Sequence, residues 1–168
     1  MANDAAPPDE RSFVQVVSDY GGSKFIDSRP LEAVPLRRQR AAALCAAVPR
    51  GVVSNWAGRV EEVSATNRWD AILRIYLYGG GSVFLQNWNE KTNAIEDKFP
   101  VAENSPAFSE ISKLERNALI KFSGSFQPNQ SDCFRTTGSG SGNESGNLAE
   151  TLMSPTFIFR WDDVRPLK

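Results

Sequence analysis

Apolar and polar residues alternate regularly in the middle of this chain. The alternation is clearest in Ala71–Tyr78 and Ser82–Trp88, with three glycines between the two runs. A period of two is typical of a half-buried strand, and a short glycine turn between two such runs is typical of a hairpin. Three further runs have strand character: Val52–Val63, Leu119–Phe126 and Pro155–Val164. The pattern therefore predicts five strands.

Apolar residues three and four positions apart predict helices elsewhere. A short amphipathic helix is expected over Arg11–Tyr20, and a longer alanine-rich helix over Leu36–Val48. Ser105-Pro106 begins a third helix, because serine is a good N-cap and proline suits the first helical position. The two prolines in Ser28–Pro35 predict a loop, and the polar, proline-rich residues Met1–Glu10 predict disorder.

From Gly51 onward the predicted order is three strands, a helix and two strands. This is the order of the five-stranded OB-fold barrel, an architecture that binds oligonucleotides and oligosaccharides. We therefore predict a mainly β protein with an OB-fold barrel over residues 51–168, a helical extension over 11–50 and a disordered segment over 1–10. Gly58, inside the first strand, predicts a bulge or a sharp bend. The Gly/Ser-rich stretch at 136–147 predicts a flexible loop between the last two strands.

Charge and composition narrow the functional classes. The formal net charge is −1 and the chain has no histidine. Because there is no global positive field to attract nucleic acid, a polyanion site has to be a local patch. Without histidine, Ser-His-Asp and Cys-His mechanisms are excluded within this chain.

The remaining candidate motifs do not predict catalysis. Glu61-Glu62 and Asp162-Asp163 are neighbours on predicted strands, so the members of each pair face opposite sides and do not converge. The glycine run at 79–81 lacks the lysine and the following helix of a phosphate-binding loop. The sequence therefore predicts a non-enzymatic protein with no metal and no cofactor.

The cysteines and the N-terminus bear on the compartment. Cys45 and Cys133 are far apart and form no CxxC motif. One disulfide is an open alternative, but we favour two unpaired thiols, since free cysteine usually behaves as a small hydrophobe. No run approaches the ~20 apolar residues that span a bilayer, and Met1–Glu10 lacks the basic and apolar regions of a signal peptide. We therefore expect a cytoplasmic protein.

Four stretches of the chain resemble a known family. They are NWAGRVEEV at 55–63, SPAFSEISKL at 105–114, IKFSGSF at 120–126 and LMSPTFIFRWDDV at 152–164. With the arginine-rich start of the alanine-rich helix, they resemble a bacterial family of OB-fold domains described as tRNA-anticodon-binding-like, whose members are mostly of unknown function. The resemblance covers about 37–164 and implies a nucleic-acid-binding-like barrel without catalytic residues. The Gly/Ser stretch at 136–147 departs from the family pattern.

A candidate ligand surface follows from the predicted barrel. In OB folds the ligand crosses strands two and three, between the loop joining strands one and two and the loop joining strands four and five. Binding of a single strand needs aromatic platforms for the bases and cations for the backbone. The outward positions of the hairpin and its neighbours supply both kinds of residue: Arg59, Arg68, Trp69, Arg74, Tyr76, Tyr78, Phe84, Trp88 and Lys121.

Two functions fit this surface. The first is weak binding of single-stranded nucleic acid. The second is a protein-interaction module (an adaptor, an inhibitor or an assembly subunit, including self-association) that uses the barrel face or an exposed strand edge. Alternatively, the same aromatic residues are buried under the N-terminal helices, where Phe13, Val17 and Leu44 need partners. The low net charge favours burial or protein contact over base stacking.

Overall fold

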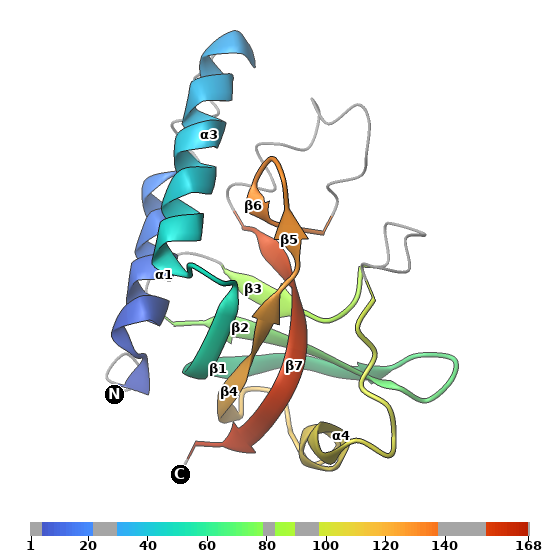
Figure 1. The fold of residues 1–168 in the computed structure, drawn as a ribbon. Helices are drawn as coiled ribbons and strands as arrows, with labels where there is room; N and C mark the ends of the chain where they lie inside the picture. The colour runs from blue at the N-terminus through green and yellow to red at the C-terminus, as the bar shows by residue number, and fades with distance from the viewer. Residues whose placement is uncertain (1–4, 22–29, 79–82, 90–97, 138–153, 168) are drawn as a thin grey trace.

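A β-barrel carries three helices in the part of the chain that the structure describes (Figure 1). The computed structural model describes residues 5–21, 30–78, 83–89, 98–137 and 154–167. The helices are α1 (Pro8–Asp19), α3 (Pro30–Ala47) and α4 (Pro106–Ile111). The strands are β1 (Val52–Ala65), β2 (Ala71–Leu77), β3 (Phe84–Gln86), β4 (Leu119–Phe126), β5 (Pro128–Asn129), β6 (Cys133–Phe134) and β7 (Thr156–Pro166).

Five strands close the barrel in the order β1-β2-β3-β7-β4, and β4 pairs back with β1. β3 and β7 are parallel, whereas the other neighbouring strands are antiparallel. This is the strand order of an OB-fold, so the predicted fold class is confirmed. The predicted third strand, Ser82–Trp88, is shorter than expected and spans Phe84–Gln86. The predicted glycine turn at 79–81 lies outside the described residues.

Two irregularities in β1 flank Gly58 instead of falling on it. The register shifts between Val53 and Trp56 against β4, and between Val60 and Glu62 against β2. Gly58 itself is regularly paired on both sides of the strand. A Cβ at Gly58 would lie 2.9 Å from Ile75 Cδ1, so glycine permits the close approach of β2. The irregularities therefore lie before Trp56 and after Val60, and not at Gly58.

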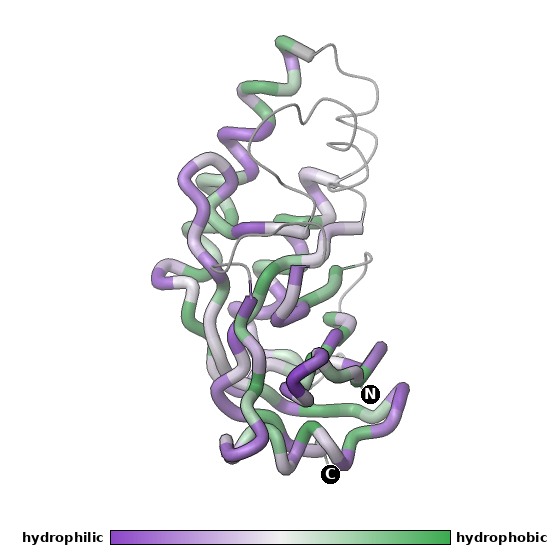
Figure 2. Tube along the Cα trace, turned by 90° about the vertical axis from the view of Figure 1, so that its right-hand side faces the viewer, coloured by the Kyte–Doolittle hydropathy of each residue, from purple (hydrophilic) through white to green (hydrophobic). Residues whose placement is uncertain are grey.

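Hydrophobic and hydrophilic residues alternate along the strands (Figure 2), and the hydrophobic set fills the barrel. In β2, Leu73, Ile75 and Leu77 occupy one side of the alternation and are completely buried. The predicted N-cap of α4 is also present, because Ser105 Oγ accepts a hydrogen bond from the Phe108 backbone N–H. The buried Ile111 of α4 belongs to the barrel core.

α1 covers one end of the barrel and begins earlier than predicted. The ring of Phe13 is fully buried, with its centroid 4.9 to 6.3 Å from the rings of four barrel or hairpin aromatics: Trp56, Phe126, Phe134 and Phe157. Asp9 accepts a hydrogen bond from Trp56 Nε1 (2.9 Å), and Glu10 accepts one from the Ala57 backbone N–H (2.8 Å). The predicted disorder over residues 1–10 is therefore wrong from Pro8 onward, because these acidic side chains anchor the helix to β1. Residues 1–4 lie outside the described part.

α3 also begins earlier than predicted, at Pro30. The expectation of a loop over Ser28–Pro35 is therefore wrong from Pro30 onward. Proline is tolerated in the first turn of a helix, and Pro35, one turn further on, removes one hydrogen bond at an exposed position where water can replace it. The longer helix moves its arginine cluster away from the N-terminus, and Arg37 pairs with Asp132 in the β5–β6 turn at 2.6 Å.

The connection from β4 to β7 contains more structure than the sequence indicates. It forms the β5–β6 hairpin, and Cys133 in β6 is bonded to Cys45 in α3, with a Cα–Cα distance of 5.7 Å. The expectation of two unpaired thiols is wrong, because the fold brings together two residues that lie 88 positions apart. Thr136 is buried and bridges to Phe157, so the predicted flexible loop does not begin there. Residues 138–147 of that prediction lie outside the described part.

Candidate nucleic-acid interface

Outward side chains of β1, β2 and the β3 segment form a grid on one side of the barrel. The register pairs Arg59 with Tyr76 and Tyr76 with Phe84, which makes the first row. Two further rows follow toward the loop between β1 and β2. We call these nine residues the three-strand face: Arg59, Tyr76 and Phe84, then Glu62, Arg74 and Gln86, then Ser64, Ile72 and Trp88.

Two arginines of the three-strand face lie over aromatic rings. Arg59 Cζ is 5.1 Å from the centroid of Tyr76, and Arg74 Cζ is 4.3 Å from the centroid of Phe84. The Nε atom of each arginine is buried without a hydrogen-bond partner, and no carboxylate in the described part of the chain pairs with either guanidinium. Both groups therefore carry a positive charge that the described residues leave unneutralised.

Tyr78 extends this aromatic group beyond the first row. Its ring is 6.4 Å from that of Tyr76, which in turn is 5.6 Å from Phe84. Burial raises the pKa of Tyr78, while the charge of Arg59 acts in the opposite direction. The hydroxyl is therefore held in its neutral, hydrogen-bonding form at physiological pH.

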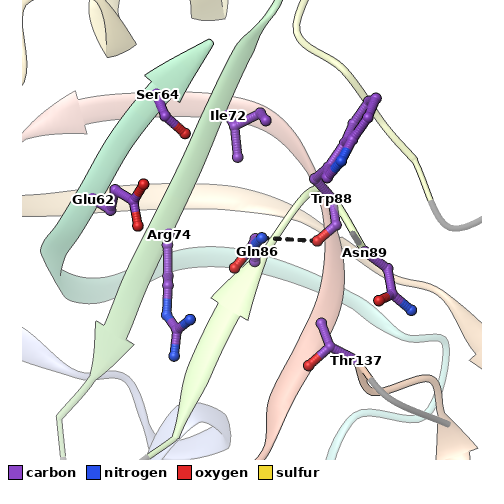
Figure 3. Close-up of a pocket in the computed structure, with 8 residues that line it drawn as sticks. All are labelled: Glu62, Ser64, Ile72, Arg74, Gln86, Trp88, Asn89 and Thr137. Carbon is purple, nitrogen blue, oxygen red and sulfur yellow. Dashed lines mark hydrogen bonds between the residues drawn. The ribbon is translucent and has the colours of Figure 1, made fainter. Parts of the chain in front are cut away.

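A hollow of about 240 Å³ lies over the second and third rows (Figure 3). Glu62 and Ser64 of β1 stand on one side of it, and Trp88 and Asn89 stand on the other. Gln86 Nε2 donates to the Trp88 carbonyl at 2.9 Å, which fixes the floor where β3 ends. Thr137, from the connection between β4 and β7, closes the rim, as the OB architecture predicts for that loop.

A second hollow, of about 650 Å³, continues from the first toward the β1–β2 loop. Ile72 and Trp88 line both hollows. The loop is a tight turn in which Thr66 Oγ1 accepts from the backbone N–H groups of Arg68 and Asp70, both at 3.2 Å. This turn presents Arg68 to solvent at the edge of the hollow.

The buried side chain of Asn87 positions Lys98 beside Trp88. Asn87 Oδ1 accepts from the Leu73 backbone N–H at 2.9 Å, and Asn87 Nδ2 donates to the carbonyls of Ala71 and Phe99. These bonds hold the segment that begins at Lys98 against the end of β3. Lys98 Nζ consequently lies 5.0 Å from the centroid of the Trp88 ring.

The structure brings together most of the predicted site residues. Arg59, Arg74, Tyr76, Tyr78, Phe84 and Trp88 lie on or beside the three-strand face, and Arg68 borders the second hollow. Trp69 is 75% exposed on the same loop with a positive φ, but it does not line the hollow. Lys121 is on β4, opposite Ala57, and α1 covers Ala57 through Glu10. Lys121 is thus separated from the face by β1.

Sequence reasoning missed several residues of the site. Glu62 joins the face only because the register shift after Val60 changes which residues of β1 point outward. Lys98 and Thr137 lie in loops, where no periodic signal marks them. Asn87 shares the buried side of β3 with Leu85, and its bonds to three backbone groups depend on where the chain returns after β3.

Phe13 does not cover the aromatic residues of the three-strand face, as the alternative of burial under the N-terminal helices requires. Its ring packs against Trp56 and the aromatics at the barrel end, and Val17 and Leu44 belong to the same buried core. Tyr76, Phe84 and Trp88 are partly exposed. The alternative in which Phe13 pairs with these three rings is therefore contradicted.

Among the described residues, no group of three or more cysteine and acidic side chains could hold a metal ion, and no helix is long and apolar enough to cross a bilayer. No protein-family model, no curated protein and no solved structure matches this chain.

Proposed function

We propose that this protein is a non-enzymatic OB-type binding module whose three-strand face holds single-stranded nucleic acid. The observation that carries the proposal is the pair of guanidinium groups, Arg59 and Arg74, stacked on aromatic rings without an acidic partner in the described part of the chain. A stacked guanidinium keeps its outer N–H groups available for phosphate oxygens, and its plane can also stack on a base.

The charges around the face support a weak, local interaction. Among the described residues of the face and its two hollows, four cations stand against two carboxylates, an excess of two positive charges on a chain of net charge −1: Arg59, Arg68, Arg74 and Lys98 against Glu62 and Asp70. Phosphate contacts release counterions, so an interaction made by these cations weakens as salt rises. We therefore expect affinity that depends strongly on salt and little on base sequence.

A protein-interaction module is the second candidate, and the Cys45–Cys133 disulfide favours it. Disulfides persist mainly in oxidising compartments. This bond therefore supports a location outside a reducing cytoplasm, in place of the cytoplasmic location expected from the sequence. The partner of such a module would be an acidic peptide, because carboxylates suit the same unneutralised guanidinium groups.

The test is a tryptophan-fluorescence titration with a mixed-sequence single-stranded DNA, a matching RNA and a poly-glutamate peptide, at low and moderate salt. Trp88 lines both hollows and Trp69 is exposed beside them, so both report on a ligand at the face. We expect quenching by DNA and RNA that weakens with salt. Binding of the peptide alone supports the second candidate, and no response to any probe contradicts both.

Two variants locate the binding. Arg74→Gln is expected to weaken nucleic-acid binding about fivefold to tenfold and to reduce the salt slope by about one. Arg38→Gln is the matched control, because Arg38 is exposed on α3, away from the three-strand face, and the substitution changes net charge equally. Equal effects of the two substitutions would show that the interaction is non-specific charge attraction and would contradict a site on this face.

A further inference from the structure

A third hollow adjoins the second of the two that border the three-strand face. It has a volume of about 460 Å³ and lies between the segment Lys98–Ala102, the start of α4, and Arg160–Asp162 of β7. Figure 1 shows the chain running past the ends of β1 and β2 down to α4, and bridges at Ala71–Val101 and Trp88–Lys98 hold that segment in place.

The three hollows form a series with shared walls. Ile72 and Trp88 line the first and the second, and Lys98 and Pro100 line the second and the third. The series therefore begins at Arg74 on the three-strand face and passes Lys98, which lies over the ring of Trp88. It ends at β7, on the other side of the segment that precedes α4. We call this series the three-hollow track.

Trp161 marks the far end of the three-hollow track. Only 5% of its surface is exposed. Its ring packs against Phe122 and Phe159 at centroid distances of 5.3 and 4.6 Å. Its Nε1 atom is buried and has no acceptor in the described part of the chain, although Trp161 lines the third hollow. A buried indole N–H normally has a hydrogen-bond partner, so an acceptor that the described residues do not supply is expected there.

The cations at this end have different surroundings. Arg160 is paired with Asp162 at 3.5 Å, and both are more than half exposed. Such an exposed pair is weak and is easily exchanged for a phosphate contact. Lys98 lines both the second and the third hollow. A ligand strand that passes from one to the other therefore passes a positive charge.

We propose that the ligand is an elongated single strand that follows the three-hollow track, with an acceptor oxygen opposite Trp161 Nε1. This inference rests on the proposed function and adds to it the length and the course of the ligand. A small anion held by Arg59 and Arg74 would leave the second and third hollows and the orphan indole N–H unused. OB folds occupy roughly 4 to 16 nucleotides of a strand, which is consistent with a track longer than one face.

The experiment measures affinity against strand length. Oligothymidylates of about 4, 8, 12 and 16 nucleotides span the range of OB-fold sites. They are titrated into the full chain and into Arg74→Gln, Lys98→Gln, Arg160→Gln and Arg165→Gln. Arg165 is the matched control for Arg160, since it is also on β7, also lies beside an aspartate (Asp163, 3.6 Å), and lines none of the three hollows.

For the wild type, we expect the affinity for the oligothymidylate to keep increasing from the shortest strand into the longer ones. Lys98→Gln and Arg160→Gln should weaken the binding of the longest strand about fivefold, and should change the binding of the shortest strand less than about twofold. Arg74→Gln should weaken all lengths, and Arg165→Gln none. Trp161→Phe, which keeps an aromatic ring at this position and removes the indole N–H, should weaken only the longer strands.

The failures of the two proposals can be distinguished. Binding that depends on Arg74 but stops increasing at the shortest strand overturns the track and leaves the face. The track is likewise wrong when Arg160→Gln and Arg165→Gln behave alike at every length. Absence of binding at all lengths overturns the proposed function together with the track.

Discussion

At the scale of single residues, Glu10 has the most unusual environment in the described part of the chain. Its carboxyl group, in the first turn of α1, is fully buried against β1. One oxygen accepts the Ala57 backbone N–H, and the other has no hydrogen-bond partner among the described residues. Burial raises the pKa of Glu10 from 4.5 to about 8; the hydrogen bond to Ala57 and the charge of Arg11 lower it, and Asp9 raises it further. The carboxyl group is therefore protonated in the folded protein at neutral pH.

This protonation makes stability depend on pH. In the unfolded chain Glu10 ionises near its ordinary pKa of 4.5, whereas in the folded protein it keeps its proton up to about pH 8. Folding takes up a proton between these values, so the free energy of unfolding falls as the pH rises through this interval. We expect the wild type to lose on the order of a few kcal/mol between about pH 5 and pH 8.

Glu10→Gln tests the origin of that loss. Glutamine keeps an acceptor for the Ala57 N–H and cannot ionise, so urea unfolding should show a flatter pH profile and a variant more stable than wild type near pH 8. Glu103→Gln, at an exposed position, is the control and should follow the wild-type profile. Parallel profiles for wild type and Glu10→Gln would show that Glu10 is ionised in the folded protein.

At the scale of elements, α1 acts as a plug for one end of the barrel. Its apolar stripe was readable from the spacing of Phe13, Val14 and Val17, all of which are buried. Its first turn was not readable, because prolines and acidic residues there resemble a disordered tail. Only the contacts of Asp9 and Glu10 with β1 make that turn part of the fold.

Phe13→Ala should show how much this plug contributes to the free energy of unfolding. The ring contacts four other aromatic rings and is fully buried, so its removal should cost about 3–5 kcal/mol of unfolding free energy in urea. Val16→Ala, on the same helix at a partly buried position, should cost less than about 1.5 kcal/mol. Similar losses for both would mean that α1 adds general helix packing and does not seal the barrel.

At the scale of the whole molecule, one covalent bond joins the helical extension to the rim of the barrel. Cys45 lies in α3 and Cys133 in the β5–β6 hairpin, and the same hairpin pairs with α3 through Asp132 and Arg37. From Cys133 the chain runs directly to Thr137, which lines the first hollow. The disulfide therefore ties α3 to a wall of the candidate site.

Reduction should loosen this connection. A disulfide that closes a loop of 88 residues is expected to contribute about 3–5 kcal/mol, so a reductant should lower the free energy of unfolding by that amount. The double variant Cys45→Ser/Cys133→Ser should be less stable from the start and insensitive to reductant. Alkylation of two thiols in denatured protein that was never reduced would show that the bond does not form.

The sequence predicted more of the barrel than of the candidate site. Strand order and facing followed from alternation, as in β2, where Leu73, Ile75 and Leu77 point inward and Arg74 and Tyr76 outward. The aromatic and basic members of the three-strand face were found for that reason. The hollows were not, since their walls include loop residues such as Lys98 and Thr137, whose positions depend on contacts distant in sequence.

The sequence by itself determined the five barrel strands, their order along the chain and the side chains that β2 and β3 present outward, because the period of a strand is a local property of backbone geometry. The outward set of β1 also depends on the register shift after Val60. Tertiary structure alone decided three further features: the bond between Cys45 and Cys133, the anchoring of the first turn of α1, and the placement of Arg59 and Arg74 over their rings. Each depends on the meeting of segments whose spacing along the chain carries no local signal. Barrel closure is what brings those segments together.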